Sequence, residues 1–107
     1  MEKRMKTETN IIQVTSKSRP EITIDPLTKA VYIKFSNKDV SKTIDDSANG
    51  VIVNIDVDGN GDVVGVELIG VKNFTLMGTQ KMLSQRINRI PDLMSARINT
   101  PPQRIPA

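Results

Sequence analysis

The sequence contains neither cysteine nor histidine among its 107 residues. Without cysteine, the chain has no disulfide framework and no thiolate that acts as a nucleophile or a metal ligand. Without histidine, it lacks the usual general base and the commonest transition-metal ligand, which argues against a zinc or non-haem iron site. No pair of nucleophile and base is visible either. We therefore expect a protein that is not an enzyme and that carries no cofactor.

Long apolar runs are also missing, and none approaches the ~20 residues that cross a bilayer as a helix. The charged N-terminus, MEKRMKTETN, leads into no apolar segment, so we expect no signal peptide. These features favour a cytoplasmic, bacterial-type protein that has no membrane partner. No feature of the sequence points to a small-molecule substrate.

Charge is unevenly distributed along the chain, although the net charge is only +3. Residues 1–20 carry a net charge of +3, residues 21–71 carry −5 and residues 72–107 carry +5. Such asymmetry indicates separate segments. We expect a basic N-terminal arm over 1–20, an acidic antiparallel β domain over 21–71, a basic helical segment over 72–98 and a Pro-rich tail over 99–107.

Alternation of apolar β-branched residues with polar ones runs through the acidic segment and is typical of short strands. In AVYIKF, for example, Val31, Ile33 and Phe35 share one face. Turns rich in Gly, Asn, Asp and Pro separate the expected strands, which cover 21–25, 30–35, 40–47, 51–56 and 62–70. Residues Ile11–Thr15 are a candidate for an extra strand. The pattern predicts an α+β fold with a small antiparallel β-meander of four or five strands.

The hydrophobic period changes after the meander and becomes helical. Apolar residues at spacings of three, four and seven line one helical face, namely Leu76, Leu83, Ile87, Ile90 and Met94. Thr75 or Thr79 can cap the helix, and Pro91 breaks or restarts it. We expect a second short helix that ends near Ile98. This C-terminal amphipathic segment, with methionines Met77, Met82 and Met94, is expected to pack on the apolar face of the sheet.

The stretch IDVDGNGDVVGVE matches the spacing of a calcium-binding EF-hand loop, with Asp56 first, Asp58 third and Glu67 twelfth. An EF-hand needs a helix on each side, whereas strand patterns flank this stretch. An extended run would also carry Glu67 roughly 16 Å from the turn. We therefore predict a hairpin turn with Glu67 on the outer face of the sheet. Calcium binding stays a distant alternative, with Asp56, Asp58 and Asp62 as weak metal candidates.

Residues 22–70 resemble a bacterial family called domain of unknown function 2283. The resemblance rests on an ADALYI-like strand and a closing hairpin of the form D-x-D-x-x-G-x-V-V-G-I-E, and the matching residues are Asp25, Ala30, Tyr32, Ile33, Asp56, Asp58, Gly65 and Glu67. Some members resemble the smaller partner encoded beside toxin-like proteins. The resemblance thus implies a binding role, of which an antitoxin-like accessory protein is one form. It implies no catalytic residue.

The remaining candidate residues concern partners. Asp45 and Asp46 are neighbours on a strand and point to opposite faces, so we interpret them as a solvated strand end rather than a paired site. Tyr32 lies on the outer face of its strand, where it either covers the sheet or contacts a partner. The candidates for partner binding are Tyr32, Leu83, Arg86, Ile87 and Arg89.

These residues lead to two hypotheses about function. The first is a non-enzymatic interaction module that binds a protein partner or forms a homo-oligomer. The alternative is nucleic-acid binding through the basic ends, for which the candidate phosphate contacts are Lys3, Arg4, Lys6, Lys81, Arg86, Arg89 and Arg97. Aromatic side chains that stack on bases are nearly absent. The simpler interpretation of the basic residues on the helix is a solvated face, and the alternative is contact with phosphate groups or with an acidic protein.

Overall fold

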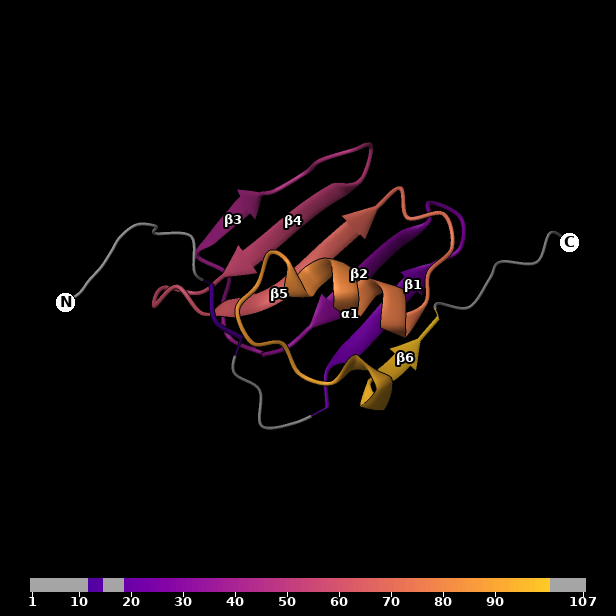
Figure 1. The fold of residues 1–107 in the computed structure, drawn as a ribbon. Coiled ribbons are helices and arrows are strands. Elements are labelled where there is room, and N and C mark those ends of the chain that lie inside the picture. Colours follow the sequence, from indigo (N-terminus) through magenta and orange to yellow (C-terminus); the bar gives the residue numbers. More distant parts are fainter. Residues whose placement is uncertain (1–11, 15–18, 101–107) are drawn as a thin grey trace, which may run out of the picture.

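The computed structural model describes residues 12–14 and 19–100, which form a six-stranded sheet with one α-helix (Figure 1). The order of strands across the sheet is β3-β4-β5-β2-β1-β6. Neighbouring strands are antiparallel except β1 and β6, which are parallel. The elements are β1 (Glu21–Asp25), β2 (Ala30–Lys34), β3 (Lys42–Asp45), β4 (Ile52–Val57), β5 (Val63–Ile69), α1 (Leu76–Ser84), the 3-10 turn η1 (Leu93–Ser95) and β6 (Arg97–Asn99).

The predicted α+β class is confirmed, and a strand forms within each of the five predicted ranges. The predicted antiparallel meander of four or five strands is only partly correct, because β6 adds a sixth strand in parallel and the strands do not follow the simple order of a meander. After β2 the chain passes to the far edge of the sheet and forms β3, and β5 then returns to pair with β2. The reason lies in the polarity of the two strands. Strand β5 is buried along most of its length, whereas β3 is mostly exposed and tolerates an edge. The apolar strand therefore takes the centre.

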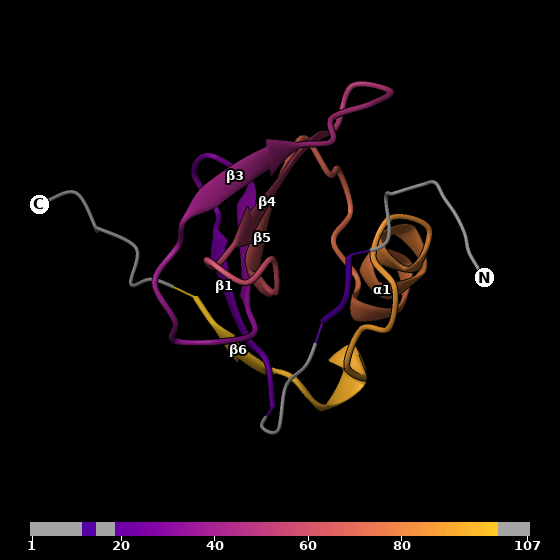
Figure 2. The ribbon, with the colours of Figure 1, turned by 90° about the vertical axis from the view of Figure 1, so that its left-hand side faces the viewer.

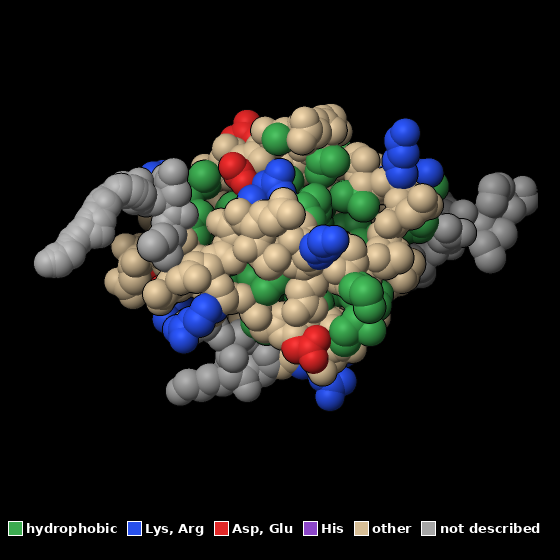
Figure 3. All heavy atoms as spheres, in the orientation of Figure 1, with side chains coloured by type: hydrophobic (Ala, Val, Ile, Leu, Met, Phe, Trp, Pro, Cys, Tyr) green, Lys and Arg blue, Asp and Glu red, His purple; other side chains and the backbone are tan. Residues whose placement is uncertain are grey.

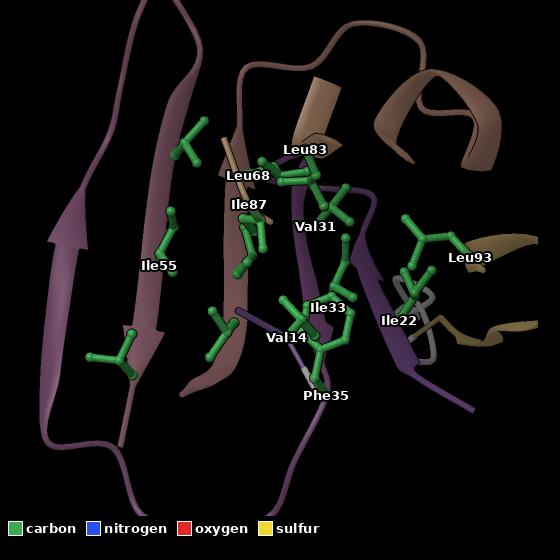
Figure 4. Close-up of a cluster of buried hydrophobic side chains, with 14 residues drawn as sticks. Val14, Ile22, Val31, Ile33, Phe35, Ile55, Leu68, Leu83, Ile87 and Leu93 are labelled. Atoms are coloured by element: carbon green, nitrogen blue, oxygen red, sulfur yellow. The ribbon is translucent and has the colours of Figure 1, made fainter. Parts of the chain in front are cut away.

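One face of the sheet carries the hydrophobic core, and α1 lies over that face (Figures 1 and 2). Apolar side chains from the alternating positions of the strands meet there, including Ile22, Ile33, Ile55 and Leu68. Leu83 at the end of α1 and Ile87 in the turn after it belong to the same cluster, as Figure 4 shows. Among the described residues, no helix lies over the opposite face, which we call the outer face (Figure 2). The predicted cover of the sheet by the 76–98 segment is confirmed for α1.

A bulge changes the register between β4 and β5. Val57 pairs with Val63, whereas the preceding Asp56 pairs with Gly65, so Val64 is the extra residue. Val63 consequently belongs to the core cluster, and Val64 is buried outside it. The simple alternation of side chains along β5 would place Val64 on the core face with Val66 and Leu68, but the β-bulge shifts the alternation by one residue.

The helical segment is much shorter than the sequence predicts. Thr75 caps α1, since its Oγ1 accepts a hydrogen bond from the Gly78 N–H at 3.0 Å, but the helix ends at Ser84. Arg89 has a φ of 60°, which is incompatible with continuing the helix. Ile87 and Ile90 still reach inward, because the turn after α1 folds back over the sheet.

The expected second helix, ending near Ile98, is also wrong. Only the three-residue η1 forms after Pro91, and the Asp92 carboxylate caps it by accepting from the Met94 N–H at 3.0 Å. The chain then extends as β6, in which Ile98 pairs with Ile22 of β1. The 72–98 segment is therefore helical only in part. Met82 packs against the core as predicted, whereas the packing predicted for Met77 and Met94 is wrong because both are exposed.

The segment before β1 contributes to the core through residues 12–14. Val14 is buried, its N–H donates to the Asn88 carbonyl at 3.3 Å, and Gln13 forms an isolated parallel bridge with Asn88. The candidate strand Ile11–Thr15 is thus seen as a single bridge, and its two end residues lie outside the described residues. Most of the predicted arm and tail, 1–11 and 101–107, lies outside them too. Within the described part of the chain, no helix is long and apolar enough to cross a membrane.

The burial of Leu83 predicts that α1 is required for the fold. We expect Leu83→Ala to lower the free energy of unfolding by about 2–5 kcal/mol, because the substitution leaves a cavity between α1 and the sheet. Ser84→Ala, at the neighbouring exposed position, is the control and should change stability by less than about 0.5 kcal/mol. Urea unfolding measures both. Equal effects of the two variants would mean that α1 does not cover the core.

Candidate functional site

Four of the residues that carry the family resemblance lie together on the outer face of the sheet. Tyr32 of β2 pairs with Glu67 of β5, and Glu67 pairs in turn with Asn54 of β4. In the adjacent row, Gly65 of β5 pairs with Asp56 of β4. The register of the three central strands therefore brings Tyr32, Asp56, Gly65 and Glu67 into one polar cluster, although up to 35 positions separate them in the sequence.

Hydrogen bonds connect the side chains of this cluster. Tyr32 Oη donates to Asp56 Oδ2 at 2.9 Å, and Thr43 Oγ1 on β3 donates to Asp56 Oδ1 at 2.7 Å. Beside them, Asn54 Nδ2 donates to Glu67 Oε1 at 3.2 Å. Each carboxylate thus has a partner from a neighbouring strand. The cluster fixes the relative positions of β3, β4, β5 and β2 on the face that no helix covers.

Gly65 is required by the path of the Tyr32 side chain. To reach Asp56, which lies two strands away, the tyrosine ring passes directly over Gly65 on the intervening strand. A Cβ atom at position 65 would overlap Tyr32 Oη and the adjacent ring atoms. The backbone of Gly65 has no positive φ, so the requirement is for space and not for a special conformation.

The environment of Tyr32 keeps its hydroxyl protonated. Partial burial raises the pKa of Tyr32 well above its ordinary value, and the hydrogen bond to Asp56 and the negative charges of Asp56 and Glu67 raise it further. A phenol in this state donates a hydrogen bond and does not act as a base. Of the two interpretations of Tyr32, the structure supports the one in which its ring covers the sheet.

The predicted hairpin between β4 and β5 is confirmed. The Asp58 N–H donates to the Asp62 carbonyl at 2.9 Å, and Gly61 takes a φ of 86° in the turn. The Asp58 carboxylate accepts from the N–H groups of Asn60 and Asp62 at 2.8 and 3.0 Å. Burial alone would raise the pKa of Asp58, but these two N–H groups and the charge of Lys38 outweigh it and hold the pKa below its usual range.

The residues that match the calcium-loop spacing thus have different structural roles. Asp56 and Glu67 belong to the polar cluster on the outer face, while Asp58 caps the turn. Asp62 accepts one of the turn hydrogen bonds through its carbonyl. Over residues 12–14 and 19–100, no three side chains of the metal-binding types come together. The arrangement is that of a hairpin whose acidic residues stabilise local structure.

Two of the predicted partner contacts are not on the surface. Leu83 and Ile87 are only 0% and 2% exposed, and both pack in the chain's own core. Their assignment to a partner surface is wrong, because the helical spacing that suggested a free apolar face reflects cover of the sheet. Arg89 remains exposed in the turn after α1.

Arg86 has a contact that the sequence did not reveal. Its Nε lies 2.7 Å from Asp46 Oδ2, which ties the turn after α1 to the end of β3. Asp45, on the other side of that strand end, accepts from the Ser47 hydroxyl and N–H, and these bonds lower the pKa of Asp45. The two acids therefore do not form a paired site, as predicted. A charged pair that joins residues 40 positions apart has no local signal in the sequence.

The described basic residues proposed for nucleic-acid contact are divided between two sides of the molecule. Lys81 and Arg89 lie on the α1 side of the molecule, whereas Arg97 pairs with Glu21 on the outer face. Lys3, Arg4 and Lys6 lie outside the described residues.

An apolar groove beside α1 is a further candidate site that the sequence analysis missed. Met77, Ile90 and Met94 line it together with polar side chains of α1, and its volume is about 450 Å³. Figure 3 shows hydrophobic side chains gathered on this face between α1 and η1. The helical pattern assigned these residues to the core. Early termination of α1 and the formation of η1 instead leave Met77 and Met94 at the surface.

The contact between Gly65 and Tyr32 predicts a strong coupling between the two positions. Gly65→Ala should destabilise the protein by about 1–3 kcal/mol, because the new methyl group displaces the tyrosine from Asp56. In a Tyr32→Ala background, the same substitution should cost much less, since the obstructing ring is gone. Gly59→Ala is a matched control, because a Cβ atom there meets nothing within 4 Å. Denaturant unfolding of the four proteins of the cycle measures the coupling, and additive effects would contradict the geometry.

The raised pKa of Tyr32 predicts a loss of stability at high pH. Unfolded tyrosine ionises near pH 10, whereas the folded protein keeps Tyr32 protonated there. The contribution of Tyr32 to stability is therefore full below about pH 10 and decreases as the pH rises above it. Tyr32 is the only tyrosine, so the ultraviolet absorbance of its phenolate can be followed directly. The Tyr32→Phe variant should lack this part of the pH dependence of stability. Ionisation of Tyr32 near pH 10 in the folded protein would refute the prediction.

Comparison with known proteins identifies one part of the chain. The family model described as Protein of unknown function (DUF2283) matches residues 21–72, which span β1 to β5. No curated protein and no solved structure matches the chain. The elements α1, η1 and β6 lie beyond the matched residues. The segment 21–72, about half of the chain, is thus similar to the family of proteins of unknown function DUF2283.

Proposed function

We propose that this protein is a non-enzymatic interaction module that self-associates through the groove between α1 and η1. The observation that carries this proposal is the exposure of two methionines in that groove. Met77 is 71% exposed and Met94 59% exposed, and both line the same hollow with Ile90. Methionine is common at adaptable protein interfaces, because its unbranched side chain adjusts to the surface that it meets.

The groove is held in place by contacts of its own, which supports a binding surface that exists before association. Gln80 Oε1 on α1 accepts from the Leu93 N–H of η1 at 3.2 Å. Leu93 itself is fully buried in the core, so η1 is anchored beside the helix. A preformed surface loses little conformational entropy when it binds.

The charges of the groove support a second copy of this chain as the partner. Lys81 and Asp92 both line it and carry opposite charges. Neither forms an ion pair with another of the described residues. In an interface with two-fold symmetry, the same surface of each copy faces the other, so Lys81 of one copy can approach Asp92 of the other. An acidic or basic partner would leave one of these charges opposed by a like charge.

The state of the acidic residues and of Tyr32 supports the non-enzymatic part of the proposal. Asp56 accepts from two hydroxyl groups, Glu67 from Asn54, and Asp58 from the N–H groups of its turn. A general base needs a free lone pair that faces a substrate. Tyr32 is held protonated, which makes it a poor nucleophile. We also propose a cytoplasmic location, which fits the absence of cysteine.

If the protein self-associates through the groove, a charged residue in place of either exposed methionine should prevent association. Sedimentation velocity over a range of concentrations should show a dimer for the wild type, and Met77→Asp and Met94→Asp should give monomers, because a buried unpaired carboxylate opposes association. Both positions are exposed in the single chain, so the variants should keep the circular dichroism of the wild type.

Leu27→Asp is the matched control, since Leu27 is 83% exposed in the turn between β1 and β2. This variant should sediment as the wild type does. A wild type that stays monomeric at every concentration would contradict the proposal. So would a dimer that Leu27→Asp disrupts and the two methionine variants leave intact, because the interface would then lie elsewhere.

A further inference from the structure

A polar cavity opens where β1, β2 and β6 begin or end, away from the groove between α1 and η1. Its volume is about 210 Å³, and its lining includes Arg19, Glu21, Lys34, Ser36, Asn37 and Arg97. The cavity is smaller than the roughly 300–1,000 Å³ of sites that take a drug-sized ligand. It therefore suits a small chemical group and not a whole cofactor.

The pairing of the strands brings the charged residues of this cavity together. Glu21 pairs with Lys34 across the antiparallel β1 and β2, and it pairs with Arg97 across the parallel β1 and β6. Side chains at paired positions lie next to one another on the same face of a sheet. Lys34, Glu21 and Arg97 thus form a row on the outer face.

Backbone hydrogen bonds hold the two flanking segments at the ends of this row. The Arg97 N–H donates to the Pro20 carbonyl at 3.0 Å, which fixes the residue next to Arg19. The N–H groups of Phe35 and Ser36 both donate to the Val64 carbonyl, at 2.8 and 3.2 Å. The walls of the cavity are therefore set by the sheet itself.

The cavity has an excess of positive charge. Three of the lining residues are cationic and one is acidic. Glu21 Oε2 lies 2.9 Å from Arg97 Nη2, so the single carboxylate is bonded to one of the three cations. Arg19 and Lys34 form no ion pair with another described residue. An arginine has five N–H donors, so Arg97 keeps donors for a ligand while Glu21 holds its guanidinium in place.

The available donors define the chemistry of the ligand. Guanidinium and ammonium groups around a small polar hollow suit an oxyanion with several acceptor oxygens, of which phosphate is the most common in biology. Phe35 also lines the cavity, but its side chain is only 5% exposed, so it offers no surface on which a base stacks. Recognition would depend on charge and hydrogen bonds alone.

We propose that this cavity binds a phosphate group, with Arg19, Lys34 and Arg97 as its ligands. The group is either a free phosphate or monoester, or a phosphodiester of a nucleic-acid backbone, and the same three residues serve both. The site is separate from the groove proposed for self-association, so each can fail without the other.

The first test is a titration of the full chain with inorganic phosphate, followed by the backbone amide signals in NMR at low and constant ionic strength. Saturable shifts confined to residues 19–21, 34–37 and 97 are expected. Arg19→Gln and Lys34→Gln should each weaken binding about tenfold, because each removes one charge-assisted hydrogen bond. Both side chains are exposed, so neither change should unfold the protein.

Lys42→Gln is the matched control, since Lys42 is exposed on β3 at the opposite edge of the sheet. It removes the same charge and should leave the phosphate affinity unchanged. Absence of saturable shifts in the cavity would overturn the proposal. An equal loss of affinity in Lys42→Gln would overturn it too, because binding would then follow net charge and not the site.

A second titration, with a short single-stranded oligodeoxynucleotide that lacks terminal phosphates, distinguishes the two sources of the group. Displacement of bound phosphate by the oligonucleotide, weakened by Lys34→Gln and not by Lys42→Gln, assigns the site to a nucleic-acid backbone. Retention of phosphate in the presence of the oligonucleotide assigns it to a free phosphate or monoester. Either result supports a phosphate site.

Discussion

The central position of β5 is the constraint on which the rest of the structure depends. Both edges of this strand are hydrogen bonded, to β4 on one side and to β2 on the other, and most of its residues are buried. Consecutive residues of β5 point to opposite faces, and their burial shows that both faces of the strand are covered. One face receives α1 and the core, and the other receives the Tyr32 ring, which lies over Gly65 and ends at Asp56. The polar cluster is therefore also a cover for the middle of the sheet.

The sequence predicted the elements whose signal is local. Alternation located β1, β2 and β4, and the threonine before Leu76 marked the start of α1. The strand patterns around residues 56–62 were enough to replace a calcium loop with a hairpin. In each case the information lies within a few neighbouring residues.

The errors concern features that depend on residues far apart in the chain. Alternation says which side chains face the core and says nothing of which strand lies beside which, so the order of strands was wrong. Ile90, Met94 and Ile98 have helical spacing, but pairing of Ile98 with Ile22 stabilises a strand there instead. The hydrogen bond from Tyr32 to Asp56 spans 24 positions and has no local pattern. The polar cluster, the groove and the cavity all escaped prediction for this reason.

The parallel pairing of β6 with β1 has a consequence for synthesis of the chain. Glu21 and Arg97 are 76 positions apart, so the second neighbour of β1 is made long after β1 itself. The five strands of the family segment are complete at Ile69, before α1 and β6 exist. At that moment Ile22, Ile33 and Leu68 have no helix over them. A nascent chain at this stage exposes an apolar sheet face, the kind of surface that chaperones recognise and that aggregates when release is premature. Helix α1 and strand β6 thus complete the cover and the edge of the sheet only after its five antiparallel strands have been made.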